Sequence, residues 1–254
     1  LWQARRGSDL YLRGTLRSAG TAGRHILLIM MKYRCLVFDH DDTTVNSTAT
    51  IHYPCFQSFL KIYYPGRQCS LEEFFVKNFS PGFLPMCQGE NGMDERMIEI
   101  ETEFWQNYVR DRIPEAYPGI REIMARQKEQ GGMTAVISHS YRENILRDYA
   151  KNGLPEPDLI FGWEMPPEQR KPAPWPMQEV LRQLNLQPEE ILMIDDLKPG
   201  YDMAQACGVP FAAAGGANDI PEIERFMRQN SDLYFKQVSE LASYLFGTDD
   251  KGEA

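Results

Sequence analysis

The chain has 254 residues, of which 43% are hydrophobic and 25% charged, and its formal net charge is −9. This composition is typical of a folded protein with enough apolar residues for a core. The negative balance disfavours a general binder of nucleic acid or of anionic membranes. It leaves a phosphorylated substrate open, because a bound metal ion can invert the field of a site.

Cysteine usage and hydropathy bear on the compartment. The five cysteines are scattered, and no CxxC pair occurs, which indicates free thiols in a reducing compartment. No apolar stretch approaches the roughly 18 residues needed to span a membrane. We therefore expect a cytoplasmic protein, either a monomer or a weak homodimer, with no nucleic-acid or membrane partner.

Residues 1–30 differ in composition from the rest of the chain. They contain five arginines and one acid, a local charge of +4, so the remainder of the chain carries −13. An Arg-rich, acid-poor leader is compatible with a presequence. We expect instead translated upstream sequence or a non-native extension, with the folded protein starting at Met30 or Met31.

Short apolar runs alternate with helical patterns through most of the chain. The runs lie at about 33–38, 134–137, 159–161, 191–194 and 209–212. Between them, Ile120, Ile123 and Met124 show helical spacing, as do Met177 and Val180. This alternation predicts an α/β fold with a doubly wound, Rossmann-like parallel sheet.

One interval breaks the alternation and predicts an inserted helical domain. About 95 residues separate the first two strands, too many for a single crossover. Aromatic stripes at helical spacing and a capping box at Ser70-x-x-Glu73 indicate several helices. We predict a helical cap at 48–114, a core at 31–47 and 115–247, hinges near 45–48 and 113–119, and a flexible tail at 248–254. The aromatic stripes favour a cap core over a ligand site.

An acidic run follows the first strand directly. It begins with Asp39 and continues through His40, Asp41 and Asp42 to Thr43. Ligands of open α/β sheets bind at the carboxyl ends of strands. Two carboxylates two residues apart can divide the work there, one as nucleophile or metal ligand and the other in proton transfer. Taken alone, the run is equally compatible with a simple turn or helix cap.

Three later stretches place further polar groups after apolar runs. Ser138 ends the second run, Lys171 precedes a proline, and the pair Asp195 and Asp196 ends the fourth run. Singly, such residues are usually turns or solvated charges. Together, and in this order, they resemble the four motifs of the haloacid dehalogenase superfamily of phosphotransferases. The likeness spans about 33–215 and is closest to the branch of phosphoglycolate phosphatase and β-phosphoglucomutase, in which a helical cap follows the first motif.

The resemblance implies a role for each motif residue. Asp39 would be the nucleophile that forms an aspartyl-phosphate, and Asp41 the general acid and then the base. Ser138 and Lys171 would contact the phosphoryl oxygens. The phosphate would also be bound around Asp42, Thr43 and His139, whose neighbourhood supplies backbone donors. Mg²⁺ would be held by a set of four residues: Asp39, Asp41 through its carbonyl, Asp195 and Asp196.

These implications predict a Mg²⁺-dependent phosphomonoester hydrolase of a small phosphorylated metabolite. A phosphoglucomutase-like transferase and a catalytically silent relative remain as alternatives. Asp42 departs from the branch, which usually has Gly there. Dehalogenase and phosphonate hydrolase chemistry are disfavoured, because Asp41 fits neither. The roles of four residues stay open: His40, His52, His139 and Asp202.

Overall fold

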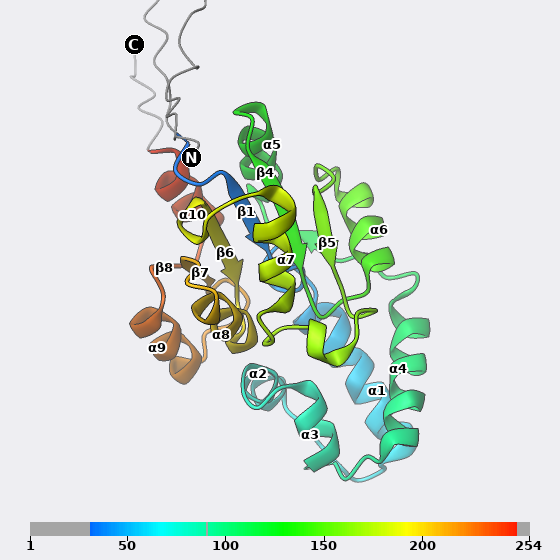
Figure 1. Ribbon diagram of the computed structural model, residues 1–254. Helices are drawn as coiled ribbons and strands as arrows, with labels where there is room; N and C mark the ends of the chain where they lie inside the picture. The colour runs from blue at the N-terminus through cyan, green and yellow to red at the C-terminus, as the bar shows by residue number, and fades with distance from the viewer. Residues whose placement is uncertain (1–30, 90, 248–254) are drawn as a thin grey trace, which may run out of the picture. The chain divides into compact units, whose positions relative to one another are not determined.

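The computed structural model describes residues 31–89 and 91–247 (Figure 1). The predictions for the leader 1–30 and the tail 248–254 lie outside these described residues. None of the described helices is both long and apolar enough to cross a membrane.

A six-stranded parallel sheet forms the centre of the core. Its order is β5-β4-β1-β6-β7-β8, with β1 at Cys35–Phe38 flanked by β4 at Met133–Ile137 and β6 at Ile191–Asp195. The outer strands are β5 (Leu159–Phe161), β7 (Phe211–Ala214) and β8 (Leu233–Phe235). The predicted doubly wound α/β fold is confirmed. The edge strand β8 was not predicted, because it leads almost directly into the apolar pattern of 238–246, and periodicity alone does not separate a short strand from a buried helical turn.

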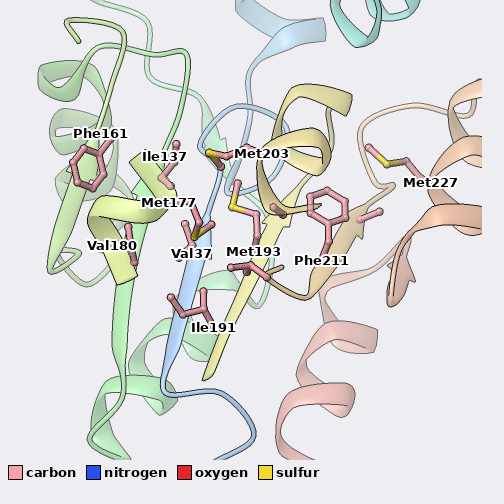
Figure 2. Close-up of a cluster of buried hydrophobic side chains, with 14 of the residues drawn as sticks. Val37, Ile137, Phe161, Met177, Val180, Ile191, Met193, Met203, Phe211 and Met227 are labelled. Carbon is pink, nitrogen blue, oxygen red and sulfur yellow. The ribbon is translucent and has the colours of Figure 1, made fainter. Parts of the chain in front are cut away.

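Alternating side chains of each strand supply two separate cores. Val37 packs on one face of the sheet with Met177 and Met203, as Figure 2 shows, whereas Leu36 and Phe38 pack on the other. The first face is covered by α7 (Trp175–Leu184), α8 (Lys198–Ala206) and α9 (Pro221–Asn230). The second is covered by α5 (Ile120–Glu129), α6 (Arg142–Asn152) and α10 (Val238–Phe246). Each large apolar side chain buried there contributes about 1.5–3 kcal/mol. Single turns of 3₁₀-helix occur at Pro167–Gln169 and Pro188–Glu190.

Between β1 and β4 the chain forms a group of helices with its own core. A π-helical turn (Thr48–His52) leads into α1 (Tyr53–Tyr63), followed by α2 (Leu71–Phe79), α3 (Phe83–Gly89) and α4 (Glu95–Val109). The predicted capping box at Ser70 and Glu73 is present at the start of α2. Phe56, Phe59 and Leu60 are buried in this helical core, as the aromatic pattern predicted.

Two short strands join the helical insertion to the sheet domain. The outgoing chain at β2 (Val45–Asn46) pairs antiparallel with the returning chain at β3 (Glu115–Ala116). Arg147 of α6 holds the returning chain as well, because its guanidinium donates to the carbonyls of Val109, Arg110 and Arg112 at 2.9–3.4 Å. The end of α4 is thereby tied to the core.

Candidate active site

The predicted polar residues converge because their strands are adjacent and parallel. Asp39 follows β1, Ser138 follows β4, and Asp195 and Asp196 stand at the end of β6. Lys171 arrives from the loop after β5. All five side chains are buried. The carboxyl ends of three neighbouring strands thus deliver three acids and a hydroxyl to one edge of the sheet.

Lys171 bridges two of these acids. Its Nζ donates to Asp39 Oδ1 at 2.7 Å and to Asp195 Oδ2 at 2.6 Å. Burial by itself would lower the pKa of Lys171, but the charges of Asp195 and Asp39 outweigh burial and raise it. Lys171 is therefore a permanent cation that holds the Asp39 carboxylate in place.

Three carboxylates form a cluster that one lysine does not neutralise. Ligand oxygens of Asp39, Asp195 and Asp196 lie within 4.8 Å of one another. Burial raises the pKa of Asp196 well above its usual range, and the charges of Asp42 and Asp195 add to this effect. Burial likewise raises the pKa of Asp195 to about 7, although Lys171 opposes it. A divalent cation would relieve this repulsion, and an all-oxygen donor set suits Mg²⁺, so the residues fit that ion.

The three acids differ in how free their oxygens are. Asp195 has both oxygens engaged, one by Lys171 and the other by the backbone N–H of Leu197 at 2.8 Å. Asp196 accepts only a 3.3 Å hydrogen bond from Thr43 among the described donors. Asp195 also packs tightly on α8, since a Cβ at Gly200 would come within 2.0 Å of its Oδ2. The side chains of Asp39 and Asp196 are thus the better placed of the three to reach a ligand.

Asp41 sits in a network of three donors. Its Oδ1 accepts from Ser47 Oγ at 2.7 Å and from His52 Nε2 at 2.8 Å, and its Oδ2 accepts from Ser140 Oγ at 2.5 Å. Burial by itself would raise the pKa of Asp41, but His52 above all, and then His40 and Ser140, lower it well below the usual range. In this arrangement the Asp41 carboxyl group is held in its base form.

His52 links Asp41 to the helical insertion. The indole Nε1 of Trp105 donates to His52 Nδ1 at 3.0 Å. An indole N–H only donates, so Nδ1 must offer a lone pair, and the proton on Nε2 points to Asp41. Burial would lower the pKa of His52, but the nearby Asp41 carboxylate raises it overall. The hydrogen bond from Trp105 acts in the opposite direction, because Nδ1 can accept it only when the ring is neutral. A chain of hydrogen bonds therefore runs from α4 to Asp41.

Asp42 is used within the loop that follows β1. It has φ 60°, a left-handed conformation that Asp tolerates better than most residues. Its Oδ1 accepts from the backbone N–H groups of Ser47 and Thr48 at 3.1–3.2 Å, and its own N–H donates to Val45 O. Burial raises the pKa of Asp42 to about 6 despite these donors. Its predicted contact with phosphate stays a prediction.

Ser138 and His139 form the wall contributed by β4. Ser138 Oγ accepts from the backbone N–H of Ser140 at 3.1 Å, which leaves its own proton available to a ligand. His139 Nε2 donates to the Lys171 carbonyl at 2.7 Å, and its ring meets Trp163 edge-on. Burial and the Lys171 charge lower the pKa of His139 to about 4. His139 is therefore neutral and anchors the loop that carries Lys171.

Two residues with open roles lie away from this chemistry. His40 is buried on the other side of the loop, where its Nε2 lies 3.1 Å from Asp148 Oδ2. Asp202 pairs with Lys198 one turn earlier on α8, and both side chains are more than a third exposed to solvent. Neither belongs to the carboxylate cluster.

The site opens into a cavity of about 180 Å³ between the sheet edge and the helical insertion. Of the predicted site residues, Thr43 and Asp195 lie behind its surface, and the others line it: Asp39, Asp41, Asp42, Ser138, His139, Lys171 and Asp196. Sequence reasoning missed Ser47, Ser140 and Trp105. Ser140 could have been suspected from the repeated hydroxyl two residues after Ser138, but nothing local marks the other two.

The fold and this arrangement of acids and lysine at the strand ends define a class of hydrolytic enzyme. Residues 36–214 match the family model of the haloacid dehalogenase-like hydrolases, so the chain belongs to that family. The predicted family membership and the prediction that the chain is an enzyme are thereby confirmed.

Individual relatives share low sequence identity with this chain. The chain is 26% identical over 191 residues to the pyrophosphatase PpaX of Halalkalibacterium halodurans, covering 74% of this chain and 86% of that one. A crystal structure described as a predicted phosphoglycolate phosphatase from Haemophilus somnus aligns with TM-score 0.66 and 21% identity, over 85% of this chain and 99% of the other. CbbY from Rhodobacter sphaeroides, solved with xylulose-(1,5)-bisphosphate, aligns with TM-score 0.63 and 19% identity, over 84% and 96%.

Proposed function

We propose that this enzyme is a Mg²⁺-dependent phosphomonoester hydrolase that acts on a small phosphorylated metabolite through an aspartyl-phosphate on Asp39. One observation carries the proposal. Lys171 holds one oxygen of the Asp39 carboxylate at 2.7 Å, at the floor of a cavity that Asp41 also lines. A positioned nucleophile beside a positioned proton-transfer group is the minimum that covalent phosphate hydrolysis requires. The pyrophosphatase relatives support hydrolysis of phosphate groups.

In the first step a carboxylate oxygen of Asp39 forms a bond to phosphorus, and the bond from phosphorus to the ester oxygen breaks. The departing alkoxide takes a proton from Asp41. Ser138 donates its free O–H to a phosphoryl oxygen, and Lys171 offsets the negative charge that builds up there. The products of this step are the free alcohol and phosphorylated Asp39.

In the second step Asp41, now a carboxylate, accepts a proton from water as the water oxygen attacks phosphorus. The bond between phosphorus and Asp39 breaks, which restores the nucleophile and releases inorganic phosphate. The three donors around Asp41 stabilise its charged form, so they favour this base role. Supplying a proton in the first step requires that this network loosen.

Mg²⁺ would be held by the side chains of Asp39 and Asp196, by the Asp41 carbonyl and by Asp195 at the edge of the cluster. When bound, it would neutralise charge shared between the nucleophile and the phosphoryl group. Asp195 would serve in addition as the fixed partner of Lys171, because both of its oxygens are already engaged.

The test is phosphate release from a panel of phosphorylated metabolites and aryl phosphates, with the full chain and Mg²⁺. Asp39→Asn supplies the blank. Asp202→Asn is the matched control, since it makes the same change at a carboxylate outside the cluster. Release that vanishes in Asp39→Asn and persists in Asp202→Asn supports the proposal. Release that persists in Asp39→Asn would refute the assigned nucleophile, and no release from any compound would favour the mutase or silent alternatives.

A further inference from the structure

The cavity has an aromatic wall. Phe56, Phe74, Phe83 and Trp105 contribute from the helical insertion, and Tyr141 and Trp163 contribute from the core. An apolar cavity of about 150 Å³ is enough to hold a benzene ring. The cavity has a volume of about 180 Å³, and its aromatic lining suits one flat, apolar ring.

On the proposed mechanism, the Trp105 end of this wall lies near the leaving group. Trp105 is bonded through His52 to Asp41, the residue assigned to protonate the departing oxygen. Trp105 also packs on Tyr141 with ring centroids 5.9 Å apart, so the aromatic wall continues from α4 onto the core. On the proposed mechanism, the leaving group therefore lies near Trp105 on α4.

Glu101 is the one carboxylic acid among the described lining residues of the helical insertion. It lies one helical turn before Trp105 on α4, lines the cavity, and is only 4% exposed to solvent. No side chain or backbone group within the described part of the chain hydrogen-bonds or ion-pairs with its carboxyl group. Burial raises the pKa of Glu101 to about 7, and His52 offsets this only in part.

Glu101 is nearly buried and lines the cavity without a protein partner, so a hydrogen-bond donor on a ligand that enters the cavity can satisfy its carboxyl group. The same cavity offers little to a second anion. Lys171 is the one lysine or arginine in the described lining, and it is engaged by Asp39 and Asp195. His52 also lines the cavity, but it is engaged by Asp41 and Trp105. A second phosphate or a carboxylate on the leaving group would therefore find no disengaged lysine, arginine or histidine in the described lining, and Glu101 would repel it.

We propose that Glu101 is a specificity-determining residue that accepts a hydrogen bond from the leaving group of an aromatic phosphomonoester, and that a cationic amine is the strongest donor. This inference rests on the proposed phosphatase function and names its substrate class. A protonated amine beside Glu101 would keep the carboxylate ionised and form a charge-assisted pair inside a water-poor cavity. Pyrophosphate and phosphoglycolate would be poor substrates, because Glu101 repels their second negative charge.

Three aryl phosphates that differ at one group test the proposal. They are 4-methylphenyl phosphate, which has no donor, 4-(hydroxymethyl)phenyl phosphate, a neutral donor, and 4-(aminomethyl)phenyl phosphate, a cation. The wild-type full chain with Mg²⁺ should show a kcat/KM about 10- to 100-fold higher for the aminomethyl ester than for the methyl ester. The hydroxymethyl ester should fall between them.

Glu101→Gln separates charge from shape. The amide keeps an acceptor oxygen, so the preference for the hydroxymethyl ester should largely survive, whereas the preference for the aminomethyl ester should fall at least about tenfold. Phosphoglycolate should become a better substrate. Glu103→Gln is the matched control, because it makes the same change two residues along α4 at an exposed position, and it should leave every ratio as in wild type.

Different results would contradict the phosphatase function and the role of Glu101. If wild type releases phosphate from other compounds of the metabolite panel but from none of the three esters above the Asp39→Asn blank, the phosphatase function stands and this proposal is refuted. If it releases phosphate from no compound of either set, the phosphatase function falls and this proposal falls with it. If wild type hydrolyses all three with equal kcat/KM, the function stands and the role of Glu101 is refuted. That comparison needs no variant, so it holds even if Glu101→Gln does not fold. An unchanged aminomethyl preference in folded Glu101→Gln would refute the role as well.

Discussion

Replacing Lys171 by methionine isolates the value of a buried cation in this site. Lys171 and Lys198 both reach a carboxylate at 2.6 Å, yet the Lys171 pair with Asp195 is fully buried and the Lys198 pair with Asp202 is more than one-third exposed. Removing one partner of a buried pair typically costs 3–5 kcal/mol, because the remaining charge stays desolvated, whereas an exposed pair contributes about 0–1 kcal/mol. We expect Lys171→Met to lower the free energy of unfolding by about 3–5 kcal/mol at pH 8 and Lys198→Met by less than about 1 kcal/mol.

The pKa of Asp195 determines how the stability loss of Lys171→Met changes with pH. Asp195 binds its proton at about pH 7 in the folded chain, against an ordinary value of 3.8. Between these values the folded state binds more protons than the unfolded state, so stability falls as pH rises. Lys171 lowers the pKa of Asp195, so this pKa is higher in Lys171→Met, and the stability of that variant continues to fall above pH 7. The deficit of Lys171→Met relative to wild type should therefore be largest at pH 8 and shrink toward pH 5.

Urea unfolding followed by circular dichroism measures this deficit, with EDTA present so that no metal ion substitutes for the lysine. The three proteins are compared at pH 5, 6, 7 and 8. Equal losses for Lys171→Met and Lys198→Met at pH 8 would refute the argument from burial. A deficit of Lys171→Met that grows as the pH falls would refute the assignment of Asp195 as the responsible group.

Three further predictions concern the chemistry and the hinge. Asp41→Asn should lower kcat about 10²- to 10⁴-fold by removing both proton transfers, and steady-state hydrolysis of an aryl phosphate measures it; a rate equal to that of wild type contradicts the acid and base role. EDTA should stop turnover, and added Mg²⁺ should restore it. Beryllofluoride with Mg²⁺ should add about 2.7 kcal/mol to the free energy of unfolding at 100 times its Kd, which a higher Tm would reveal. An unchanged Tm would count against a formed phospho-acceptor site. Arg147→Met should raise KM several-fold, because the end of α4, the helix that carries Trp105, loses its hydrogen bonds to the core. Arg182→Met, at an exposed position, should leave KM unchanged. Equal KM values for the two variants would contradict this role of Arg147.

Much of the site was predictable because its information is local. Asp39, Ser138 and the pair Asp195 and Asp196 each follow an apolar run directly, and parallel neighbouring strands bring such positions to one edge. Lys171 was predicted from motif order alone, since nothing local distinguishes it from a surface lysine. The helical insertion was predictable from the length of the interval between two strands.

The environment of Asp41 was decided by tertiary structure alone. Asp41 is bonded to Ser140, 99 residues away in the sequence, and His52 is bonded to Trp105, 53 residues away. Contacts of this kind depend on how the returning chain at β3 places α4 against the core. No periodicity encodes that geometry, so the role of His52 remained open and nothing in the sequence marked Trp105.

Glu101 marks the limit most clearly. Its sequence context is a helix rich in acids, in which Glu99 and Glu103 are exposed, and by pattern Glu101 is a third solvated charge. The chain by itself determined the sheet, the helices and the acids at the strand ends, because those follow from the alternation of apolar and polar residues. Only the packing of α4 over the strand ends decided that this one carboxyl group would be buried in an aromatic cavity, because burial depends on which helix face meets another element.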